Sequence, residues 1–201
     1  MKLLHIDSSI LGANSVSRSL SADIVQRQTA IHPGLEVSYH DLAADPPPQL
    51  SGAHVAAWMG AAVEDEALGK DLAVGGAYAD EVIAADIIVI GAPMYNFTVP
   101  TQLKAWIDRI SLRGKTFRYT AEGKPEGLLS NAKKVLIASA RGGVYPPGSL
   151  IDHQESYLLG MLSFLGLTDI SIIHAEGVAA GPEAREAAMA RARGKIAALA
   201  A

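Results

Sequence analysis

A cluster of hydroxyl side chains lies near the N-terminus, between two segments that are expected to be regular. Residues 8–18 read Ser-Ser-Ile-Leu-Gly-Ala-Asn-Ser-Val-Ser-Arg and contain no acidic residue. A short apolar run over 3–7 predicts a strand before them, and the apolar positions of 20–25 predict a helix after them. Such a loop binds phosphate, because the first N–H groups of a helix lack partners and lie at the positive end of its dipole. The groups expected to bind this anion belong to Ser9, Ser15, Val16 and Ser17.

The spacing of residues in this loop excludes other kinds of phosphate site. The loop lacks the Gly-x-Gly-x-x-Gly of dinucleotide-binding proteins and the Gly-Lys-Ser/Thr of nucleoside triphosphate-binding loops. The chain has no cysteine, so it also lacks the nucleophile that a phosphatase loop would need here. One of Ser15 and Ser17 is expected to cap the helix, which leaves the other hydroxyls unexplained. We therefore expect a phosphate group to be bound at this loop and not attacked.

Aromatic side chains follow the most apolar strand of the chain. The run Ile87-Ile88-Val89-Ile90 predicts a fully buried strand, and Gly-Ala-Pro-Met-Tyr-Asn-Phe follows over 91–97. Apolar residues at helical spacing over 103–110 then predict a helix with Pro100 near its first turn. In open parallel sheets, ligands bind beyond the carboxyl ends of the strands, so we expect Met94 to Phe97 to contact one. The alternative is that these side chains only close the top of the core.

Two further segments carry groups that suit a flat ligand. Residues 134–139 predict a strand, and the Gly142-Gly143 pair beyond it allows the backbone to approach a planar group closely. Residues 111–128 alternate basic and aromatic side chains and then turn on Gly and Pro, which predicts an extended excursion or hairpin that serves as a lid or pocket wall. Tyr119 and Tyr145 are the side chains expected to stack on a flat acceptor.

The remaining patterns complete an alternation of strands and helices. Strands are expected at 36–42 and 169–175, and helices near 53–68, 77–84, 150–166 and 182–200. Gly75-Gly76 is either a break or a costly pair inside a helix. Residues 43–80 are long for a crossover; within them, Trp58 and Met59 are expected to pack inside the chain, the alternative being that they cover the ligand site or a partner subunit. The whole chain, 1–201, predicts one α/β domain.

The order of these elements predicts a doubly wound, five-stranded parallel sheet with strand order 2-1-3-4-5 and helices on both faces. The serine-rich loop follows the first strand and the aromatic loop follows the third, so the two loops flank the switch point of the sheet. A ligand with a phosphate at one end and a large planar ring at the other fits both loops. FMN is such a ligand, and we expect it as the cofactor.

The composition of the chain excludes several classes of protein. Its 201 residues are 49% hydrophobic and 19% charged, which is typical of a globular protein with a sizeable core. A formal net charge of −4 argues against nucleic acid as the main partner. No apolar run has the length of a membrane span, and the N-terminus lacks a signal-peptide pattern. We therefore expect a cytoplasmic protein with no membrane partner.

Five motifs together resemble one family. They are Ser8-Ser9-Ile10-Leu11 with Ser15-Val16-Ser17, Ala92-Pro93-Met94-Tyr95-Asn96-Phe97, Thr116-Phe117-Arg118-Tyr119-Thr120, Ser139-Ala140-Arg141-Gly142-Gly143, and Ala175-Glu176-Gly177. On these motifs, and over essentially its whole length, the chain resembles the FMN-dependent NADH:azoreductase/quinone reductase family of flavodoxin-like proteins.

The resemblance implies a homodimer with one non-covalent FMN per subunit and two-electron reduction of quinones and aromatic azo compounds by NADH. No catalytic side chain is expected to be essential, because the flavin does the chemistry and the protein orients it. The nicotinamide and the acceptor are expected to use the same face of the flavin in turn, which gives ping-pong kinetics. Beyond the four residues of the serine-rich loop, the residues expected at the cofactor are Pro93, Met94, Tyr95, Asn96, Phe97, Ser139, Ala140, Arg141, Gly142 and Gly143.

Two other functions stay open on the sequence alone. One is a flavodoxin-like one-electron carrier, and the other is a flavin-binding regulator without catalytic activity. The mild net charge argues against the carrier, since carriers dock through a strongly acidic face. The sequence names neither the physiological acceptor nor the preference between NADH and NADPH.

Overall fold

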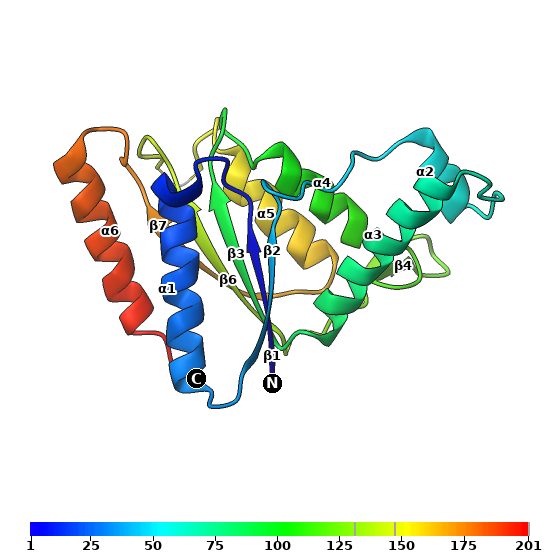
Figure 1. Ribbon diagram of the computed structural model, residues 1–201, viewed down its shortest axis with the longest axis horizontal. Coiled ribbons are helices and arrows are strands. Elements are labelled where there is room, and N and C mark those ends of the chain that lie inside the picture. The colour runs from blue at the N-terminus through cyan, green and yellow to red at the C-terminus, as the bar shows by residue number, and fades with distance from the viewer. Residues whose placement is uncertain (131, 147, 201) are drawn as a thin grey trace.

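Five parallel strands form the central sheet of the protein. The computed structural model describes residues 1–130, 132–146 and 148–200. The strand order is β2-β1-β3-β6-β7, and all neighbouring strands are parallel (Figure 1). This order confirms the predicted 2-1-3-4-5 sheet, because β4 and β5 belong to a separate hairpin. The sheet strands are β1 (Lys2–Asp7), β2 (Glu36–Asp41), β3 (Ile87–Pro93), β6 (Lys134–Ala140) and β7 (Asp169–Ala175).

β3 lies at the centre of the sheet and is buried along its whole length, as expected for a central parallel strand. Ile88 and Ile90 belong to one apolar cluster, whereas Ile87 and Val89 belong to the other, because successive side chains of a strand point to opposite faces. The strand extends past the predicted apolar run and ends at Pro93, since its last residues still pair with β6.

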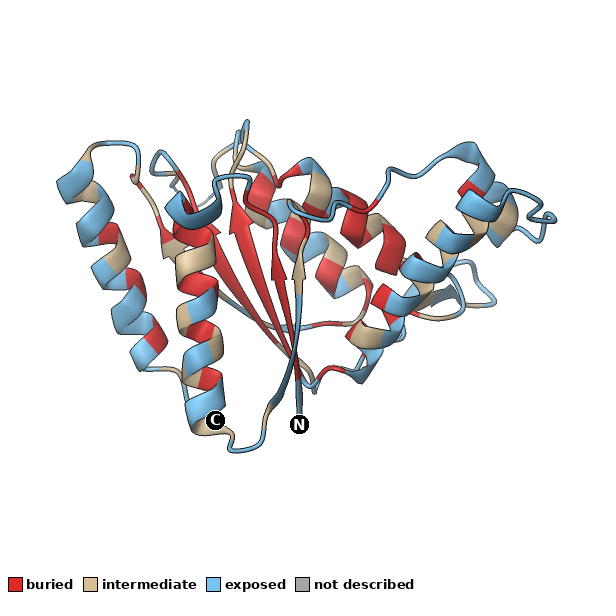
Figure 2. Cartoon of the chain, in the orientation of Figure 1, coloured by how far each residue is buried: buried red, intermediate tan, exposed pale blue. Residues whose placement is uncertain are grey.

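Helices cover both faces of the sheet. α1 (Val16–Ile31) and α6 (Pro182–Ala197) lie on one face, and α3 (Glu66–Ala84), α4 (Thr101–Ile110) and α5 (His153–Phe164) lie on the other. The buried residues of the helices face the sheet, where they form two apolar layers (Figure 2). Burial of one large aliphatic side chain contributes about 1.5–3 kcal/mol, so these layers dominate the stability of the fold. None of the helices in the described ranges combines the length and the apolarity needed to cross a membrane.

The segment between β2 and β3 contains two helices whose bounds differ from the prediction. α2 spans Gly52–Trp58 and α3 begins only at Glu66, so the single helix predicted over 53–68 is wrong. Gly60 has a φ of +96°, which ends the first helix. The side chain of Asp65 then accepts hydrogen bonds from two N–H groups of the next turn and caps a new helix.

The Gly75-Gly76 pair lies inside α3 and does not break it, so the pattern predicted at 77–84 is the second half of a longer helix. Each glycine in a helix interior costs about 1 kcal/mol relative to alanine. Gly75 is buried against Arg109 of α4, and a Cβ at position 75 would lie 3.5 Å from Arg109 Cδ. Gly75, one of the two glycines of the pair, therefore permits close packing of α3 against α4.

The end of α2 carries apolar side chains that stay exposed. Trp58 is 42% exposed and Met59 is 83% exposed. The expectation that these two residues pack inside the chain is therefore wrong, because α2 projects away from the sheet (Figure 1).

A small antiparallel hairpin follows α4. It consists of β4 (Phe117–Tyr119) and β5 (Pro125–Gly127), which confirms the hairpin predicted within 111–128. Gly127 packs directly on the turn after α5, where a Cβ at position 127 would lie 2.2 Å from the backbone nitrogen of Gly166. Gly166 itself has a φ of +100°, so both positions of this contact require glycine.

The two C-terminal helices are shorter than predicted. α5 begins at His153, because the Asp152 side chain accepts hydrogen bonds from two N–H groups of the first turn and caps the helix there. α6 begins at Pro182, as predicted, but ends at Ala197. The strand predicted at 169–175 coincides with β7.

Candidate functional site

The serine-rich loop and the aromatic loop meet at the carboxyl ends of β1 and β3. Ser9 Oγ and Tyr95 Oη share a hydrogen bond of 3.0 Å, and the Ile10 N–H donates to Tyr95 Oη at 3.2 Å. The sequence predicted that these two loops flank the switch point of the sheet, and the strand order places the loops there. The contact between Ser9 and Tyr95 therefore joins a phosphate-type loop to an aromatic loop.

The first turn of α1 offers free hydrogen-bond donors beside this contact. Ser15 is the N-cap, since its Oγ accepts a hydrogen bond from the Arg18 N–H at 3.2 Å. The N–H groups of Val16 and Ser17 come first in the helix, so no carbonyl of the helix can accept from them. The Ser15 and Ser17 hydroxyls share one hydrogen bond of 3.2 Å.

Two hydroxyl hydrogens of these side chains are not used in hydrogen bonds inside the protein. Ser15 and Ser17 carry two hydroxyl hydrogens and use one of them in their mutual bond, and the same holds for Ser9 and Tyr95. Each pair therefore keeps one hydrogen that can turn toward an anion. Although the three serines are buried, rotation about the C–O bond is enough to redirect a hydroxyl hydrogen.

Arg18 supports the serine-rich loop from behind. Its Nε and Nη2 donate to the carbonyl of Ser9 at 3.0 and 2.8 Å, and its Nη1 lies 2.7 Å from Asp41 Oδ2. A second contact joins Nη2 to the other oxygen of Asp41, so the ion pair is bidentate. This hydrogen bonding raises the pKa of Arg18 and lowers the pKa of Asp41. The only cation among residues 8–18 is thus neutralised inside the protein, and the donors that this segment leaves for an anion are uncharged.

A buried carboxylate lies under the same loop. Asp7 Oδ1 accepts a hydrogen bond from Ser21 Oγ at 2.7 Å, and Asp7 Oδ2 accepts one from Tyr39 Oη at 3.2 Å. The pKa of Tyr39 is raised, first by burial and then by the neighbouring carboxylates. Asp7 is therefore part of the frame that holds β1, β2 and α1 together.

The aromatic loop has an unusual backbone. Asn96 and Phe97 have φ values of 48° and 69°, in the left-handed region that residues with side chains rarely adopt. Hydrogen bonds hold this conformation, because the Tyr95 and Thr98 N–H groups each donate to the other's carbonyl, at 2.9 and 3.1 Å. Both Asn96 and Phe97 are exposed, so tight packing does not explain the strained backbone. Strain of this kind gathers at functional sites, which supports a ligand-binding role.

Two backbone hydrogen bonds fix the aromatic loop to its neighbours. The Met94 N–H donates to the Ala140 carbonyl at 2.8 Å, and the His153 N–H donates to the Phe97 carbonyl at 3.0 Å. A pocket of about 610 Å³ adjoins the loop. It is lined by Ile10, Met94, Tyr95, Asn96, Thr98, Val99, Pro100, Thr101 and Gln102. Pro93 is buried at the end of β3 and supports the loop from below.

The loop after β6 places the second group of predicted site residues, 139–143, beside the aromatic loop. Gly142 and Gly143 are exposed, and their carbonyls accept hydrogen bonds from the Ala179 and Gly177 N–H groups at 3.1 and 2.9 Å. Ser139 is fully buried, and its Oγ donates to Gln154 Oε1 at 3.0 Å. The side chains that face outward here are therefore not those of residues 139–141, although the sequence assigned those three residues to the cofactor.

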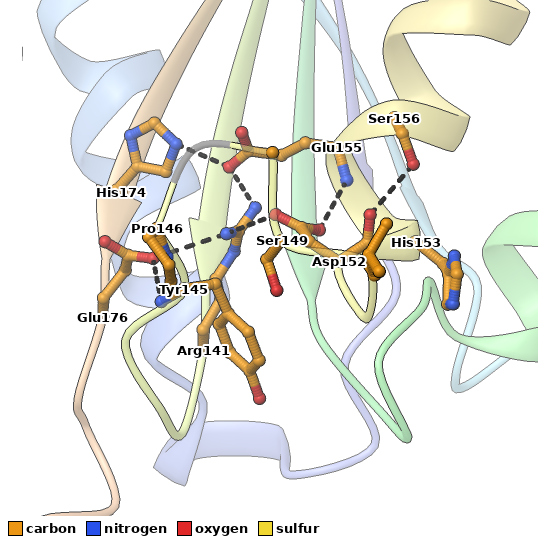
Figure 3. A pocket seen from close by; sticks show the side chains of 12 residues that line it. Arg141, Tyr145, Pro146, Ser149, Asp152, His153, Glu155, Ser156, His174 and Glu176 are labelled. Carbon is orange, nitrogen blue, oxygen red and sulfur yellow. Dashed lines mark hydrogen bonds and ion pairs between the residues drawn. The ribbon is translucent and has the colours of Figure 1, made fainter.

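Arg141 lies in a pocket of about 580 Å³ between the β6 loop and α5 (Figure 3). Its guanidinium group forms ion pairs with Asp152, Glu155 and Glu176. His174 also bonds to Glu155, with 2.5 Å between Nε2 and Oε1. Figure 3 shows these acidic side chains converging on Arg141 from α5 and from the end of β7.

The two tyrosines predicted to stack on a flat acceptor lie apart within one chain. The Tyr145 ring meets the Phe97 ring edge to face, with 6.4 Å between their centroids. Tyr119 lies on β4, which is on the far side of α4 from the carboxyl ends of β3 and β6 (Figure 1). Tyr145 thus stands beside the aromatic loop of this chain, and Tyr119 does not.

Some side chains of the site were missed at the sequence level. Gln154, Asp152 and Glu155 all surround Arg141, and Asp41 holds Arg18. Gln154 is the one with a recognisable signal, because it stands four residues before Leu158 on the apolar stripe of α5. A polar side chain on such a stripe indicates a buried hydrogen-bond partner.

Comparisons with known proteins agree with this geometry. Residues 1–200 match the family model described as "Flavodoxin-like fold". An FMN-dependent NADH:quinone oxidoreductase of Bradyrhizobium diazoefficiens is 53% identical over an alignment of 193 positions, which covers 94% of each chain. An FMN-dependent NADH:quinone oxidoreductase of Xanthomonas campestris is 52% identical over an alignment of 203 positions, which covers 99% of each chain.

A solved structure extends the likeness to three dimensions. The azoreductase of Bacillus anthracis strain Sterne superposes with a TM-score of 0.86 and 29% identity, over 98% of this chain and 97% of that chain. The fold and the family predicted from the motifs are confirmed by these matches. The chain belongs to the family of FMN-dependent NADH:quinone oxidoreductases, and its fold is flavodoxin-like.

Proposed function

We propose that this protein transfers two electrons from NADH to quinones with FMN as its cofactor, and that it also cleaves aromatic azo compounds. Relatives that are more than half identical bear the name of FMN-dependent NADH:quinone oxidoreductases, and a structural relative is an azoreductase. The observation that carries the proposal is the hydrogen bond between Ser9 and Tyr95, because it joins a phosphate-type loop to an aromatic loop at the switch point.

The serine-rich loop fits the phosphate of FMN. The N–H groups of Val16 and Ser17, with one spare hydroxyl hydrogen from each of the two hydroxyl pairs, would hold that phosphate. These donors are neutral, and the dipole of α1 adds a partial positive charge at the same place. Ser9, Ser15, Val16 and Ser17 would thus bind one non-covalent FMN per subunit.

The ring of FMN would lie between the aromatic loop and the glycine pair. Met94 to Phe97 would border one side of it, chiefly through backbone groups, and Gly142 and Gly143 would border the other. When bound, FMN supplies the two-electron chemistry, by accepting a hydride from the nicotinamide and passing the electrons to the acceptor. Apart from Tyr95, neither Met94–Phe97 nor the Gly142-Gly143 pair carries an ionisable side chain, so the chain is expected to orient the reactants without acting as an acid or base.

Two aromatic side chains would receive the flat substrates. Phe97 and Tyr145 stand edge to face beside the aromatic loop, and a nicotinamide or a quinone can stack against such a pair. The same place would serve NADH first and the acceptor second, because both must reach the same ring. This predicts ping-pong kinetics, and a cytoplasmic location fits a reaction that consumes NADH.

A second copy of the chain would complete the site. Tyr119 is 51% exposed on a hairpin that lies away from its own aromatic loop, so it would reach such a site only in another subunit. The exposed faces of α4 and α5 lie between this hairpin and the aromatic loop and are candidates for the interface of a homodimer.

The test is an absorbance spectrum of the purified protein, followed by anaerobic titration with NADH and, separately, with NADPH. We expect a flavin spectrum that one equivalent of NADH bleaches and one equivalent of quinone restores. A bound flavin that NADH leaves oxidised would contradict the proposed activity and favour a carrier or a regulator. Light scattering during gel filtration should give twice the chain mass of 21.0 kDa, and a monomer would contradict the dimer.

A further inference from the structure

Every nitrogen of the Arg141 guanidinium has a partner inside the protein. Nε donates to Ser139 Oγ at 3.2 Å and to Gln154 Oε1 at 3.0 Å. Nη1 lies 2.8 Å from an oxygen of Asp152 and 3.4 Å from an oxygen of Glu176, and Nη2 pairs with Glu155. The side chain is only 2% exposed, so these partners enclose it.

Gln154 carries this network to the strand before the aromatic loop. Its Nε2 donates to the carbonyl of Ala92 at 2.9 Å, while its Oε1 accepts from Ser139 and Arg141. Gln154 is fully buried and stands in the first turn of α5. The ends of β3 and β6 and the start of α5 are thereby joined by one side chain.

Glu176 carries the network to the loop after β6. It lies near Arg141 and also accepts a hydrogen bond from the Tyr145 N–H at 3.3 Å. The next residue, Gly177, donates its N–H to the Gly143 carbonyl at 2.9 Å. The Tyr145 ring lies 5.7 Å from the Arg141 guanidinium on one side and meets Phe97 on the other.

We propose that Arg141 is a positioning residue, which sets the distance between the aromatic loop and the Gly142-Gly143 loop and does not touch the cofactor. This rests on the proposed function, since it is the flavin ring that these two loops would hold. The role differs from the direct contact expected from the sequence, because the Arg141 side chain is only 2% exposed and its charge is already paired with three carboxylates.

The geometry also explains why arginine is needed. A guanidinium presents five N–H donors in a rigid plane, so it reaches side chains from three elements at once. A lysine at this position would keep the positive charge but would offer one flexible ammonium group in place of the planar fork. Arg141→Lys should therefore loosen the two loops while the charge of the pocket is kept.

A comparison of two flavins distinguishes an effect on the two loops that would hold the flavin ring from an effect on the serine-rich loop. The apoprotein is titrated with FMN and with riboflavin, which has the same ring and no phosphate, and binding is followed by the quenching of flavin fluorescence. We expect Arg141→Lys to weaken both flavins by the same factor, about tenfold or more, since small misplacements of binding groups have effects of that size. The ratio of the two dissociation constants should stay as in the wild type.

Arg109→Lys is the matched control. Arg109 is equally buried, pairs with the carboxylate of Asp71 and donates to the Pro48 carbonyl, but it lies on α4 outside both loops. This variant should lose stability on urea denaturation yet bind both flavins as the wild type does. Gln154→Met is a second test, because it removes the hydrogen bonds of Gln154 to Ser139, Arg141 and Ala92 and leaves all the charged groups in place. It should weaken FMN and riboflavin equally.

Several outcomes would overturn the positioning role. Unchanged binding of both flavins by Arg141→Lys and Gln154→Met would do so, and so would an equal loss in Arg109→Lys, which would show a general effect of stability. Loss of FMN binding alone would assign the network to the phosphate. A wild-type protein that binds neither flavin would instead refute the proposed function, so the two failures are distinguishable.

Discussion

Asp7 and Gly91 face each other across β1 and β3, and the carboxylate of Asp7 fills the space that a side chain at position 91 would need. A Cβ on Gly91 would lie 2.2 Å from Asp7 Oδ1, well inside contact distance. Asp7 is held in place because Ser21 donates to the same oxygen at 2.7 Å. A glycine in the central strand therefore admits a buried carboxylate directly beneath the serine-rich loop.

Gly91→Ala should lower the free energy of unfolding by about 1–3 kcal/mol, because an added methyl group overpacks a closed site. Urea denaturation measures this loss. In the double variant with Asp7→Ala, the added methyl group meets no carboxylate, so the combined loss should be smaller than the sum of the two single losses. Additive losses would contradict the steric explanation.

Gly76→Ala is the control for that experiment. Gly76 lies inside α3, and nothing stands within 4 Å of the place where its Cβ would be. Alanine should therefore raise the free energy of unfolding by about 0.5–1 kcal/mol through helix propensity alone. A loss of stability here would show that α3 does not tolerate substitution of its glycine pair.

Ser15 and Ser17 should differ in what they contribute. Ser15→Ala removes both the N-cap of α1 and a hydroxyl near the expected phosphate, so it should cost about 1 kcal/mol of stability and also weaken FMN. Ser17→Ala removes no cap and should weaken FMN with less effect on stability. Neither variant should change the affinity for riboflavin, which has no phosphate. Equal losses for the two flavins would place the phosphate elsewhere.

The left-handed backbone conformation of Phe97 costs free energy that a glycine at this position would not lose. Phe97→Gly should be more stable than Phe97→Ala by up to about 1 kcal/mol, because glycine relieves the strain at a φ of 69°, whereas both variants lose the contact with Tyr145. The same change should weaken riboflavin and FMN alike. Phe97→Ala is the comparison, since alanine loses the ring but keeps a Cβ and hence the strain. Equal stabilities of the two variants would argue against backbone strain.

The Arg18–Asp41 pair predicts a dependence of stability on pH. The pKa of Asp41 is lowered in the folded protein, chiefly by the hydrogen bond from Arg18. Its contribution is therefore complete above the pKa of an unfolded aspartate, about 4, and is lost as the pH falls through the lower pKa of the folded state. Asp41→Asn should cost roughly 1 kcal/mol at pH 7, and the difference from the wild type should shrink below about pH 4.

Denaturation at pH 7 and pH 3 measures this difference. Asp23→Asn is the control, because its partner Arg193 is 55% exposed, whereas Arg18 is 16% exposed, so this pair should contribute little at either pH. A difference between the wild type and Asp41→Asn that does not change with pH would refute the assigned role of the ion pair.

The strands and the loops at the switch point could be predicted because their signals are local. Runs of branched apolar residues such as 87–90 specify a buried strand, and topology alone then places the loops after the first and third strands together. The prediction that one helix continues through residues 59–65 was wrong, also for a local reason. The positive φ of Gly60 and the cap at Asp65 outweigh the helical spacing of the apolar residues around them.

The network around Arg141 could not be predicted, because its members come from α5, β6 and the end of β7. Which carboxylates surround a guanidinium depends on side-chain directions that no periodic pattern encodes. The motif therefore indicated that Arg141 belongs to the site but not how. For the same reason, the sequence did not show that Arg18 is neutralised by Asp41.

The ion pair between Arg18 and Asp41 has a consequence for purification of the protein. Salt weakens the binding of phosphates that are held by free cations, because ions screen charges over a Debye length of about 8 Å at physiological ionic strength. Here the donors that residues 8–18 themselves leave for the phosphate are uncharged N–H and O–H groups, whose hydrogen bonds are screened far less. A high-salt wash should therefore leave the cofactor on the protein, whereas loosening the loops with a denaturant should release it.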